Sequence, residues 1–311
     1  MSKKTSYLLG IILTIILGTI LYYFLCCSVC CGEGSCEHKE DETKSAVIPE
    51  IKDATRNAFM IKDANGDFNL KLNDNFNFKT SNFSILQPVA GDVENGVLKL
   101  KDYLLANPSK TVDITGFYKS DEVNNSAYPN LGLARANSVK NYLVLHGVSS
   151  KQIDTYGELN DAINPDENST LFGPLKFGVL TTDASDTSAI EALEKACDAV
   201  RTNPLVLHFK TGEAAIALTS EQRQKIADIS HCVDKLGVKV QVVGHTDNTG
   251  DAANNVVLGQ QRADFAKSYL IRNGILEGNI ETSSKGQTEP IADNTTEAGR
   301  SENRRTEITI N

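Results

Sequence analysis

The chain has 311 residues and a formal net charge of −9, with 40 acidic and 31 basic side chains. This acidic balance excludes a surface that binds nucleic acid or anionic lipid by charge, because both partners are themselves negative. Trp is absent and aromatic residues make up 6% of the sequence, so nothing suggests a platform on which bases could stack. The length allows two domains beside a membrane segment.

The N-terminus, residues 1–25, has the pattern of a membrane anchor. Lys3 and Lys4 precede residues 7–25, which contain no charged side chain. A helix of that length spans about 28 Å, close to the roughly 30 Å hydrocarbon core of a bilayer. The two lysines favour an N-terminus inside the cell, which places the chain after Cys26 outside the cytoplasm. We expect an uncleaved signal anchor. Leu25 is not the small residue that lipoprotein cleavage before Cys26 favours, but lipoprotein processing stays an alternative.

Five of the seven cysteines lie between Cys26 and Cys36, with His38 close by. A zinc site needs four converging ligands, whereas adjacent cysteines point in different directions and the expected compartment is oxidising. We therefore predict no metal site and no cofactor here, and expect interchain disulfides or thiols without a particular role.

Residues 26–62 read as a Cys-rich segment followed by a charged linker. Asp63, Asn65 and Asp67 weakly resemble a calcium-binding loop. The pattern lacks Glu at its last position, where Asp74 stands, so we predict an ordinary turn.

The rest of the chain repeats one pattern twice, with predicted domains at 63–182 and 183–311. FNFKT at 76–80 resembles LHFKT at 207–211, and VDITGFYKS at 112–120 resembles VQVVGHTDN at 240–248. Residues 130–157 resemble residues 255–286, which places Arg135 opposite Arg262. We call these domains the first and the second copy of one α/β fold.

Hydrophobic periodicity places the elements of the second copy. It predicts an introductory helix at 189–200, strands at 206–210, 239–244, 279–283 and 305–310, and helices at 220–236 and 254–273. Ser220 is expected as a weak N-cap, and Gly274 as the glycine that ends the long helix. Cys197 and Cys232 fall in neighbouring helices and could form a disulfide, although sequence does not show whether their Cα atoms come within reach.

Two charged residues of the second copy are candidates for ligand binding. Asp247 lies in the turn after a strand, and Arg262 lies on the next helix, on the face that also carries Asn255 and Leu258. A carboxylate facing a guanidinium suits a ligand with both an ammonium and a carboxylate group. An internal Asp–Arg pair that orders the turn explains the same spacing.

Four spaced motifs carry a family resemblance from about residue 205 to the C-terminus. GHTDNTG at 244–250, NxxLGxxRA at 255–263, PxADN at 290–294 and GRxxNRRxEI at 299–308 together resemble the C-terminal domain of OmpA-like proteins. The resemblance implies tandem βαβαββ domains, an α+β sandwich with helices packed on a mixed sheet. It also implies non-covalent binding of peptidoglycan through the diaminopimelate residue of the stem peptide.

The resemblance also assigns site residues. Asp247 and Arg262 would hold diaminopimelate, with Asn255 and Leu258 lining the site and Thr246 and Thr249 as supporting turn residues. The loop at 286–304 would cover one side. There, Arg304 and Arg305 would either serve the site or pair with acidic neighbours, and we include Arg305 in the predicted site.

The first copy departs from this pattern. Where the second copy has Thr246–Asp247, the first copy has Tyr118–Lys119 when the strands are aligned, or Lys119–Ser120 when the residues are counted back from Arg135. Tyr128 stands at the position of Asn255. We expect a spacer or a protein-binding module in which Arg135 forms a structural pair. A less favoured alternative is that Asp121 replaces the missing carboxylate from a shifted position.

These features favour a binding protein of the cell envelope over two other classes. A stator-like subunit would need an acidic residue in its span, and residues 7–25 have none. A wall hydrolase would need a catalytic constellation, and His245 near Asp247 is the nearest approach to one. We predict a non-enzyme with its domains in the periplasm of a Gram-negative cell, anchored in the inner rather than the outer membrane. The predicted partners are peptidoglycan, membrane lipid around 7–25, and a second copy of the chain or an envelope protein on the first domain. An envelope scaffold is the alternative.

Overall fold

The computed structural model describes residues 53–64, 68–182, 188–208 and 218–311. The predicted anchor at 7–25, the cysteines of the 26–36 cluster, and Asn65 and Asp67 lie outside these ranges. Within them, no helix is long and apolar enough to cross a membrane. The same ranges contain no group of three or more side chains placed to hold a metal. Residues 51–311 form one compact unit, so the boundary between the copies at 182/183 stays a prediction.

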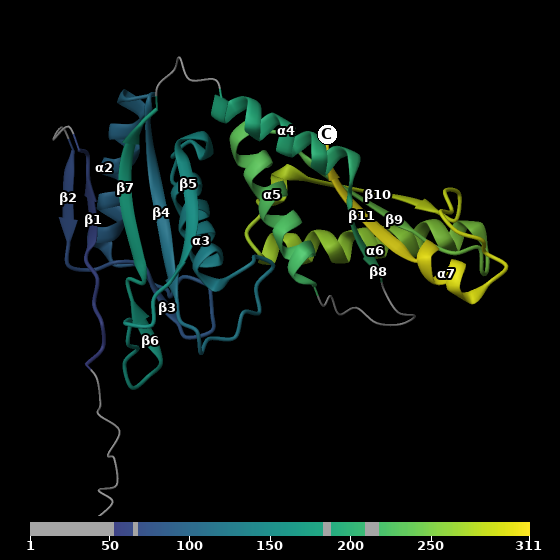
Figure 1. Ribbon diagram of the computed structural model, residues 1–311, viewed down its shortest axis with the longest axis horizontal. Coiled ribbons are helices and arrows are strands. Elements are labelled where there is room, and N and C mark those ends of the chain that lie inside the picture. Colours follow the sequence, from purple (N-terminus) through teal and green to yellow (C-terminus); the bar gives the residue numbers. More distant parts are fainter. Residues whose placement is uncertain (1–52, 65–67, 183–187, 209–217) are drawn as a thin grey trace, which may run out of the picture. The chain divides into compact units, whose positions relative to one another are not determined.

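The second copy is a four-stranded mixed sheet with helices on it (Figure 1). The strands lie in the order β10-β9-β11-β8, with β9 and β10 parallel and β11 antiparallel to both β9 and β8. The elements are β8 (Leu205–His208), α5 (Ser220–Leu236), β9 (Val240–His245), α6 (Ala252–Arg272), η3 (Glu277–Asn279), β10 (Ile280–Gly286), α7 (Glu297–Asn303) and β11 (Arg305–Ile310). This is the predicted βαβαββ order with α7 added in the last connection.

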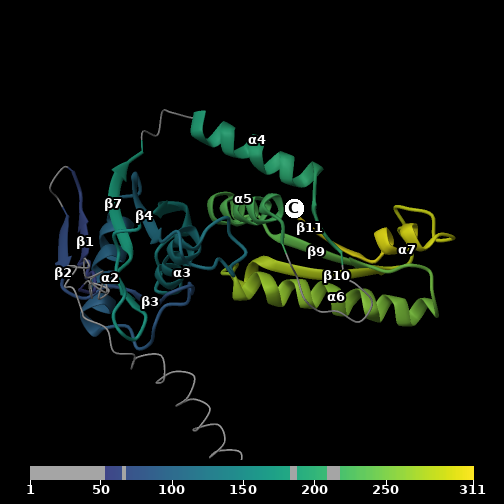
Figure 2. The ribbon, with the colours of Figure 1, turned by 60° about the horizontal axis from the view of Figure 1, so that its bottom comes forward.

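Alternation along β9 builds the core of this copy. Val240 and Val242 are fully buried, while Gln241 and Val243, which alternate with them, are partly exposed. The buried face packs on α5 and α6, which contribute residues such as Ile226 to the same cluster. Figure 2 shows α6 running along β9 and β10. The C-terminal end of β9, where the candidate site begins, is therefore fixed by a packed helix.

The first copy repeats the central arrangement. Its strands β5, β4 and β7 lie in the order β5-β4-β7, with β4 parallel to β5 and antiparallel to β7, as β9 is to β10 and β11. The strand that corresponds to β8, β3, pairs with β6. The elements are β1 (Phe59–Lys62), β2 (Asn69–Leu72), β3 (Asn77–Lys79), α2 (Gly91–Ala106), β4 (Lys110–Tyr118), α3 (Leu131–Leu145), η2 (Ser150–Gln152), β5 (Ile153–Leu159), β6 (Thr170–Phe172) and β7 (Leu175–Thr181).

Two features at the start of the first copy differ from the sequence-based expectation. Residues 59–62, predicted as linker, form β1, because Phe59 and Ile61 alternate with exposed neighbours and enter the core. The turn predicted at residues 63–67 lies partly outside the described residues, but Asp63 itself is buried. It forms a buried ion pair with Lys110 at 2.9 Å, and Tyr103 donates a hydrogen bond to it.

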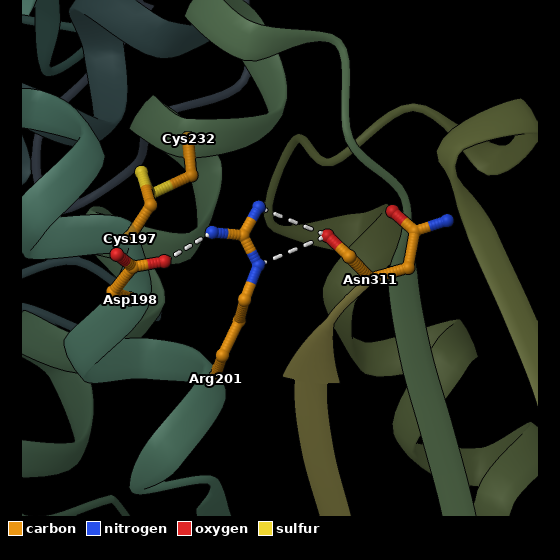
Figure 3. The surroundings of a disulfide bond; sticks show 5 residues. All are labelled: Cys197, Asp198, Arg201, Cys232 and Asn311. Atoms are coloured by element: carbon orange, nitrogen blue, oxygen red, sulfur yellow. Dashed lines mark hydrogen bonds and ion pairs between the residues drawn. A yellow bond between two sulfur atoms is a disulfide. The ribbon is translucent and has the colours of Figure 1, made fainter.

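Helix α4 (Ser188–Thr202) precedes the sheet of the second copy and is fastened to the rest of that copy at two places. Cys197 and Cys232 form a disulfide between α4 and α5, with their Cα atoms 5.9 Å apart. Arg201 of the same helix pairs with Asp198 at 2.7 Å and donates two hydrogen bonds to the carbonyl oxygen of Asn311 (Figure 3). The disulfide that the sequence allowed is thus formed.

The ends of the helices follow local rules. The N-cap of α5 is Thr219, and the expected Ser220 is instead its first helical residue. Thr219 accepts a hydrogen bond from the backbone of Gln222, whose side chain bonds back to the N-cap, so a complete capping box is present. Gly274 follows α6 with φ +96°, as predicted for the residue after a helix end.

Residues of the first copy contact the second copy through hydrogen bonds. Ala127 donates its backbone N–H to Asn273 at 2.7 Å and belongs to the hydrophobic core of the second copy. The Tyr128 hydroxyl donates to Ser230 on α5, and Tyr128 is 1% exposed. Tyr128, which stands where the second copy has Asn255, is therefore buried where the two copies contact each other.

Candidate functional site

A close contact between two glycines sets the geometry of each copy. A Cβ atom on Gly244 would lie 1.9 Å from the carbonyl oxygen of Gly259, and one on Gly116 would lie 2.1 Å from that of Gly132. Strand β9 and helix α6 approach each other as β4 and α3 do, which only glycine permits at this distance. The two pairs align the copies residue by residue and make Arg262 the counterpart of Arg135.

Both arginines then make the same backbone contact. Arg262 donates from Nη1 to the carbonyl oxygen of His245 at 2.9 Å, and Arg135 donates from Nη1 to that of Phe117 at 2.8 Å. Each arginine lies three residues after its helix glycine and contacts the residue that follows its strand glycine. Lys119 follows Phe117 by two positions, as Asp247 follows His245, so Lys119 is the counterpart of Asp247.

Asp247 is held in place by its own turn. Oδ1 accepts a hydrogen bond from the backbone of Thr249 at 2.9 Å, and Oδ2 accepts one from Nη1 of Arg304 at 2.8 Å. Burial would raise the pKa of the Asp247 carboxyl, but the hydrogen bonds from Arg304 and Thr249 outweigh it, so the pKa lies below its ordinary value. Asp247 is thus a fixed carboxylate, 9% exposed.

Arg262 is half-buried, and most of its hydrogen-bonding groups have no partner among the described residues. Its contact with His245 is its only hydrogen bond among the described residues, and no carboxylate of those residues lies within ion-pair distance. Burial lowers the pKa of the Arg262 guanidinium and Asp247 acts in the opposite direction. The internal pair of Asp247 with Arg262, which was the alternative to ligand binding, is not formed, and Asp247 pairs with Arg304 instead.

The other predicted residues lie around these two charges. Asn255 is buried and donates to the carbonyl oxygen of Thr249 at 3.1 Å and to the side chain of Gln287 at 2.6 Å. Leu258 lies on α6 and is 40% exposed. The hydroxyl of Thr246 is buried without a hydrogen-bond partner among the described residues. Asn255 and Thr249 order the turn that carries Asp247.

Arg304 and Arg305 have separate positions. Arg304, just before β11, bridges Asp247 and Glu297, each at 2.8 Å. Arg305, the first residue of β11, is 2% exposed, pairs with Glu307 at 2.7 Å and donates to the carbonyl oxygen of Glu289. Of the two, the structure brings Arg304 to the candidate site.

Sequence reasoning gave no role to Gln287 and Glu297, which contact Asn255 and Arg304. Both lie in the connection at 286–304, which the sequence predicted as a cover for the site. The only signal for them was that prediction, because a polar loop contains many equivalent side chains. Neither His245 ring nitrogen bonds to Asp247 or to any other described residue.

The first copy fills the corresponding position from within. Arg135 is fully buried and forms an ion pair through both terminal nitrogens with Glu122, whose side chain is 3% exposed. The expected structural pair of Arg135 is thus present, with Glu122 as its partner. Asp121, the less favoured candidate, is 71% exposed and pairs with Lys119.

Comparison with known proteins gives the family. A family model described as the OmpA family matches residues 78–170 and 208–304, which together are more than half of the chain. The chain belongs to the OmpA family. The two matched segments correspond to the two copies, so the internal repeat is a repeat of the OmpA family fold.

Relatives align with parts of the chain. Over 120 residues it is 36% identical to "Peptidoglycan-binding protein ArfA" of Mycobacterium tuberculosis (strain ATCC 25618 / H37Rv), covering 38% of this chain and 36% of that protein. Over 94 residues it is 37% identical to "Outer-membrane lipoprotein YfiB" of Pseudomonas aeruginosa, covering 30% of this chain and 56% of that one. The chain thus spans little more than a third of the length of ArfA.

Solved structures of other OmpA-like proteins align over similar shares. The peptidoglycan-associated lipoprotein from Burkholderia pseudomallei is 21% identical, with a TM-score of 0.30, and the match covers 34% of this chain and 89% of that one. The periplasmic domain of Helicobacter pylori MotB is 28% identical, with a TM-score of 0.27, covering 33% and 69%.

Proposed function

We propose that the second copy binds peptidoglycan non-covalently through the diaminopimelate residue of the stem peptide. The observation that carries this proposal is the pair of opposite charges at the end of β9. Asp247 is a fixed carboxylate, and Arg262 is a half-buried guanidinium with one backbone hydrogen bond among the described residues. The relative ArfA, named as a peptidoglycan-binding protein, supports the same assignment.

Each charge has a role that its chemistry suggests. Arg262 takes the side-chain carboxylate of diaminopimelate in parallel hydrogen bonds, and Asp247 accepts the ammonium group of the same side chain. Arg304, already bonded to Asp247, keeps that carboxylate ionised and oriented. Asn255 and Thr249 hold the turn, and Leu258 offers exposed apolar surface beside the site.

A site of this size gives modest affinity for one stem peptide. Hydrogen bonds to charged groups contribute about 1.5–3 kcal/mol each, and most of the interaction energy offsets the loss of ligand freedom. Many copies of the chain on one wall polymer would add avidity. With an anchor at 7–25, the protein would tether a membrane to the wall, with the inner membrane favoured and no enzymatic role.

Co-sedimentation with isolated peptidoglycan, followed by titration with stem peptides, tests this proposal. The full chain is compared with Asp247→Ala, Arg262→Ala and Arg272→Ala. Arg272 is a matched control because it is exposed on the same helix. The peptides contain either diaminopimelate or lysine, which keeps the ammonium and lacks the side-chain carboxylate.

We expect the native chain and Arg272→Ala to bind the diaminopimelate peptide, and both site variants to lose at least tenfold in affinity while staying folded. The lysine peptide should bind more weakly to the native chain, and Arg262→Ala should no longer distinguish the two peptides. Equal binding of both peptides by the native chain would contradict the role of Arg262. Absence of binding to peptidoglycan would leave the envelope scaffold as the better reading.

A further inference from the structure

We propose that Glu122 is an internal ligand of the first copy, whose carboxylate fills an anion site that holds no carboxylate of the described residues in the second copy. The inference concerns the first copy alone and does not depend on which ligand the second copy takes. It also assigns that site a chemical class, because the groups around Glu122 select a carboxylate.

The alignment of the copies locates the site. Arg135 and Arg262 occupy equivalent positions, set by the glycine contacts and by the matching bonds to Phe117 and His245. Where Arg262 has no carboxylate among the described residues, Arg135 has Glu122. The guanidinium of Arg135 therefore already binds a carboxylate, which is the group that the guanidinium of Arg262 is proposed to bind on a ligand.

Glu122 is bound as a ligand carboxylate would be. Oε2 accepts from Nη1 of Arg135 at 3.0 Å and from the backbone of Lys119 at 2.9 Å. Oε1 accepts from Nη2 of Arg135 and from the backbone of Ser81 at 2.8 Å. Four donors thus meet the two oxygens, which is about the number that a carboxylate can accept. Burial would raise the pKa of the Glu122 carboxyl, but these donors, Arg135 foremost, lower it below its ordinary value.

The loop that carries Glu122 is itself fastened. The backbone N–H of Val123 donates to the hydroxyl of Ser81 at 3.0 Å, and Ser120 donates to Asp161 from its backbone at 2.8 Å and from its side chain at 2.9 Å. A tethered group already in position has an effective concentration far above that of a free ligand. Glu122 therefore excludes an external carboxylate from the native first copy.

The charges around the filled position differ from those in the second copy. Lys119 stands where the second copy has Asp247, so no carboxylate is available to receive an ammonium group. Without Glu122 the position would present Arg135 and Lys119 together, with Asp121 as the partner of Lys119 at 3.2 Å. The site would select small carboxylate anions and reject zwitterions.

Rescue by an added carboxylate tests the proposal. Glu122→Ala is made in the full chain in an Arg262→Ala background, so that anion bound by the second copy does not contribute. The stability of each protein is followed by chemical denaturation in sodium formate, with sodium chloride at equal ionic strength as the control. Two controls are measured in parallel. One is the Arg262→Ala protein with Glu122 intact, and the other carries Arg262→Ala, Glu122→Ala and Arg135→Met together.

We expect Glu122→Ala to be less stable than its background in chloride. Formate should restore stability in a saturable manner and raise the folding equilibrium constant by roughly tenfold or more. Neither parallel protein should respond to formate beyond chloride. A folded Glu122→Ala protein without this response overturns the proposal, and so does an equal response after Arg135→Met. If Glu122→Ala does not fold in chloride, the refolding yield in formate becomes the readout, and no gain over chloride overturns it equally.

Discussion

The two copies place an arginine at the same point of the same fold and give it different surroundings. Arg135 and Arg262 donate to equivalent carbonyl oxygens at 2.8 and 2.9 Å. Arg135 also bonds to Glu122 and to the carbonyl oxygens of Asn82 and Lys79, and is completely buried. Arg262 makes a single hydrogen bond to the described residues and is half-buried. Among the described residues, Glu122 is an ion-pair partner that Arg135 has and Arg262 lacks.

This difference has an energetic reason. A guanidinium removed from water is costly unless it is paired and hydrogen-bonded, so the first copy depends on Glu122. The second copy keeps Arg262 partly in water and pairs Asp247 with Arg304. The first copy gains a buried polar network, and in the second copy Arg262 has no ion-pair partner among the described residues.

The largest expected effect tests the difference between Arg135 and Arg262 directly. Arg135→Ala should lower the free energy of unfolding by about 3–5 kcal/mol, because it leaves Glu122 buried and unpaired. Arg262→Ala should lower it by less than about 1 kcal/mol, because no carboxylate among the described residues loses a partner. Urea denaturation of the full chain measures both.

The double variant Arg135→Met with Glu122→Leu is the control for this prediction. It removes both charges, so it should recover most of the stability that Arg135→Ala loses. Similar losses for Arg135→Ala and Arg262→Ala would show that the two arginines are equally structural and would remove the basis of the comparison.

The second prediction concerns the disulfide, which only the second copy contains among the described residues. Replacing Cys197 and Cys232 by alanine should destabilise the second copy by about 2–4 kcal/mol, because the bond closes a long loop in the unfolded chain. The two residues are 35 positions apart. Reduction of the native chain should act in the same direction.

The measurement is denaturant unfolding with and without a thiol reductant, followed by hydrogen exchange in each copy. Protection should fall in α5 and β9 of the second copy and less in β4 of the first. The double alanine variant should not respond to reductant. An equal loss of protection in both copies would show that they unfold as one cooperative unit.

A pH-dependent difference arises where the first copy has Phe117 and the second has His245. The His245 side chain is 1% exposed, and its ring nitrogens have no partner among the described residues. Burial, aided by nearby Arg305, lowers the pKa of His245, while Glu307 and Glu289 act weakly in the opposite direction. The folded state therefore resists protonation of this ring.

The sign of the effect follows from this lowered pKa. Well above pH 6.5, the ordinary pKa of histidine, the imidazole is neutral in both states and contributes no pH dependence. Below that pH the unfolded chain takes up the proton first, so stability falls as pH decreases toward the folded pKa. His245→Phe should flatten this decline between pH 6.5 and 5, measured by denaturation at each pH. Burial also lowers the pKa of His231, which contributes to the pH dependence of stability in the native chain and in the variant alike. An unchanged slope would show that His245 is protonated equally in both states.

The sequence predicted what depends on local pattern and on motif order. Strand alternation, helix spacing and Gly274 gave the elements of the second copy to within a few residues, because each reflects a nearby physical preference. The motifs placed Asp247, Asn255 and Arg262 together. The sequence did not predict which arginine of the Arg304–Arg305 pair reaches Asp247, because that depends on the position at which β11 begins.

Long-range polar partners were the other limit. Glu122 lies thirteen residues from Arg135 along the chain, in a loop that also contains Asp121, and only the folded loop decides which carboxylate turns inward. β1 was missed for a different reason. Its alternation covers only four residues and follows a charged stretch, so it did not stand out from the linker.

The smallest prediction concerns helix starts, where the copies differ again. Helix α5 begins with a capping box at Thr219, whereas α2 begins after Ala90, which makes no side-chain cap. Thr219→Ala should destabilise by about 1 kcal/mol, and Thr219→Ser, which keeps the hydroxyl, by much less. Ala90→Ser should stabilise by up to about 1 kcal/mol, because the backbone at Ala90 is already extended and needs only an acceptor. Thermal and urea unfolding of the three variants measures the differences. If Ala90→Ser is neutral while Thr219→Ala is costly, packing of Ala90 against the core, rather than the missing cap, sets the start of α2.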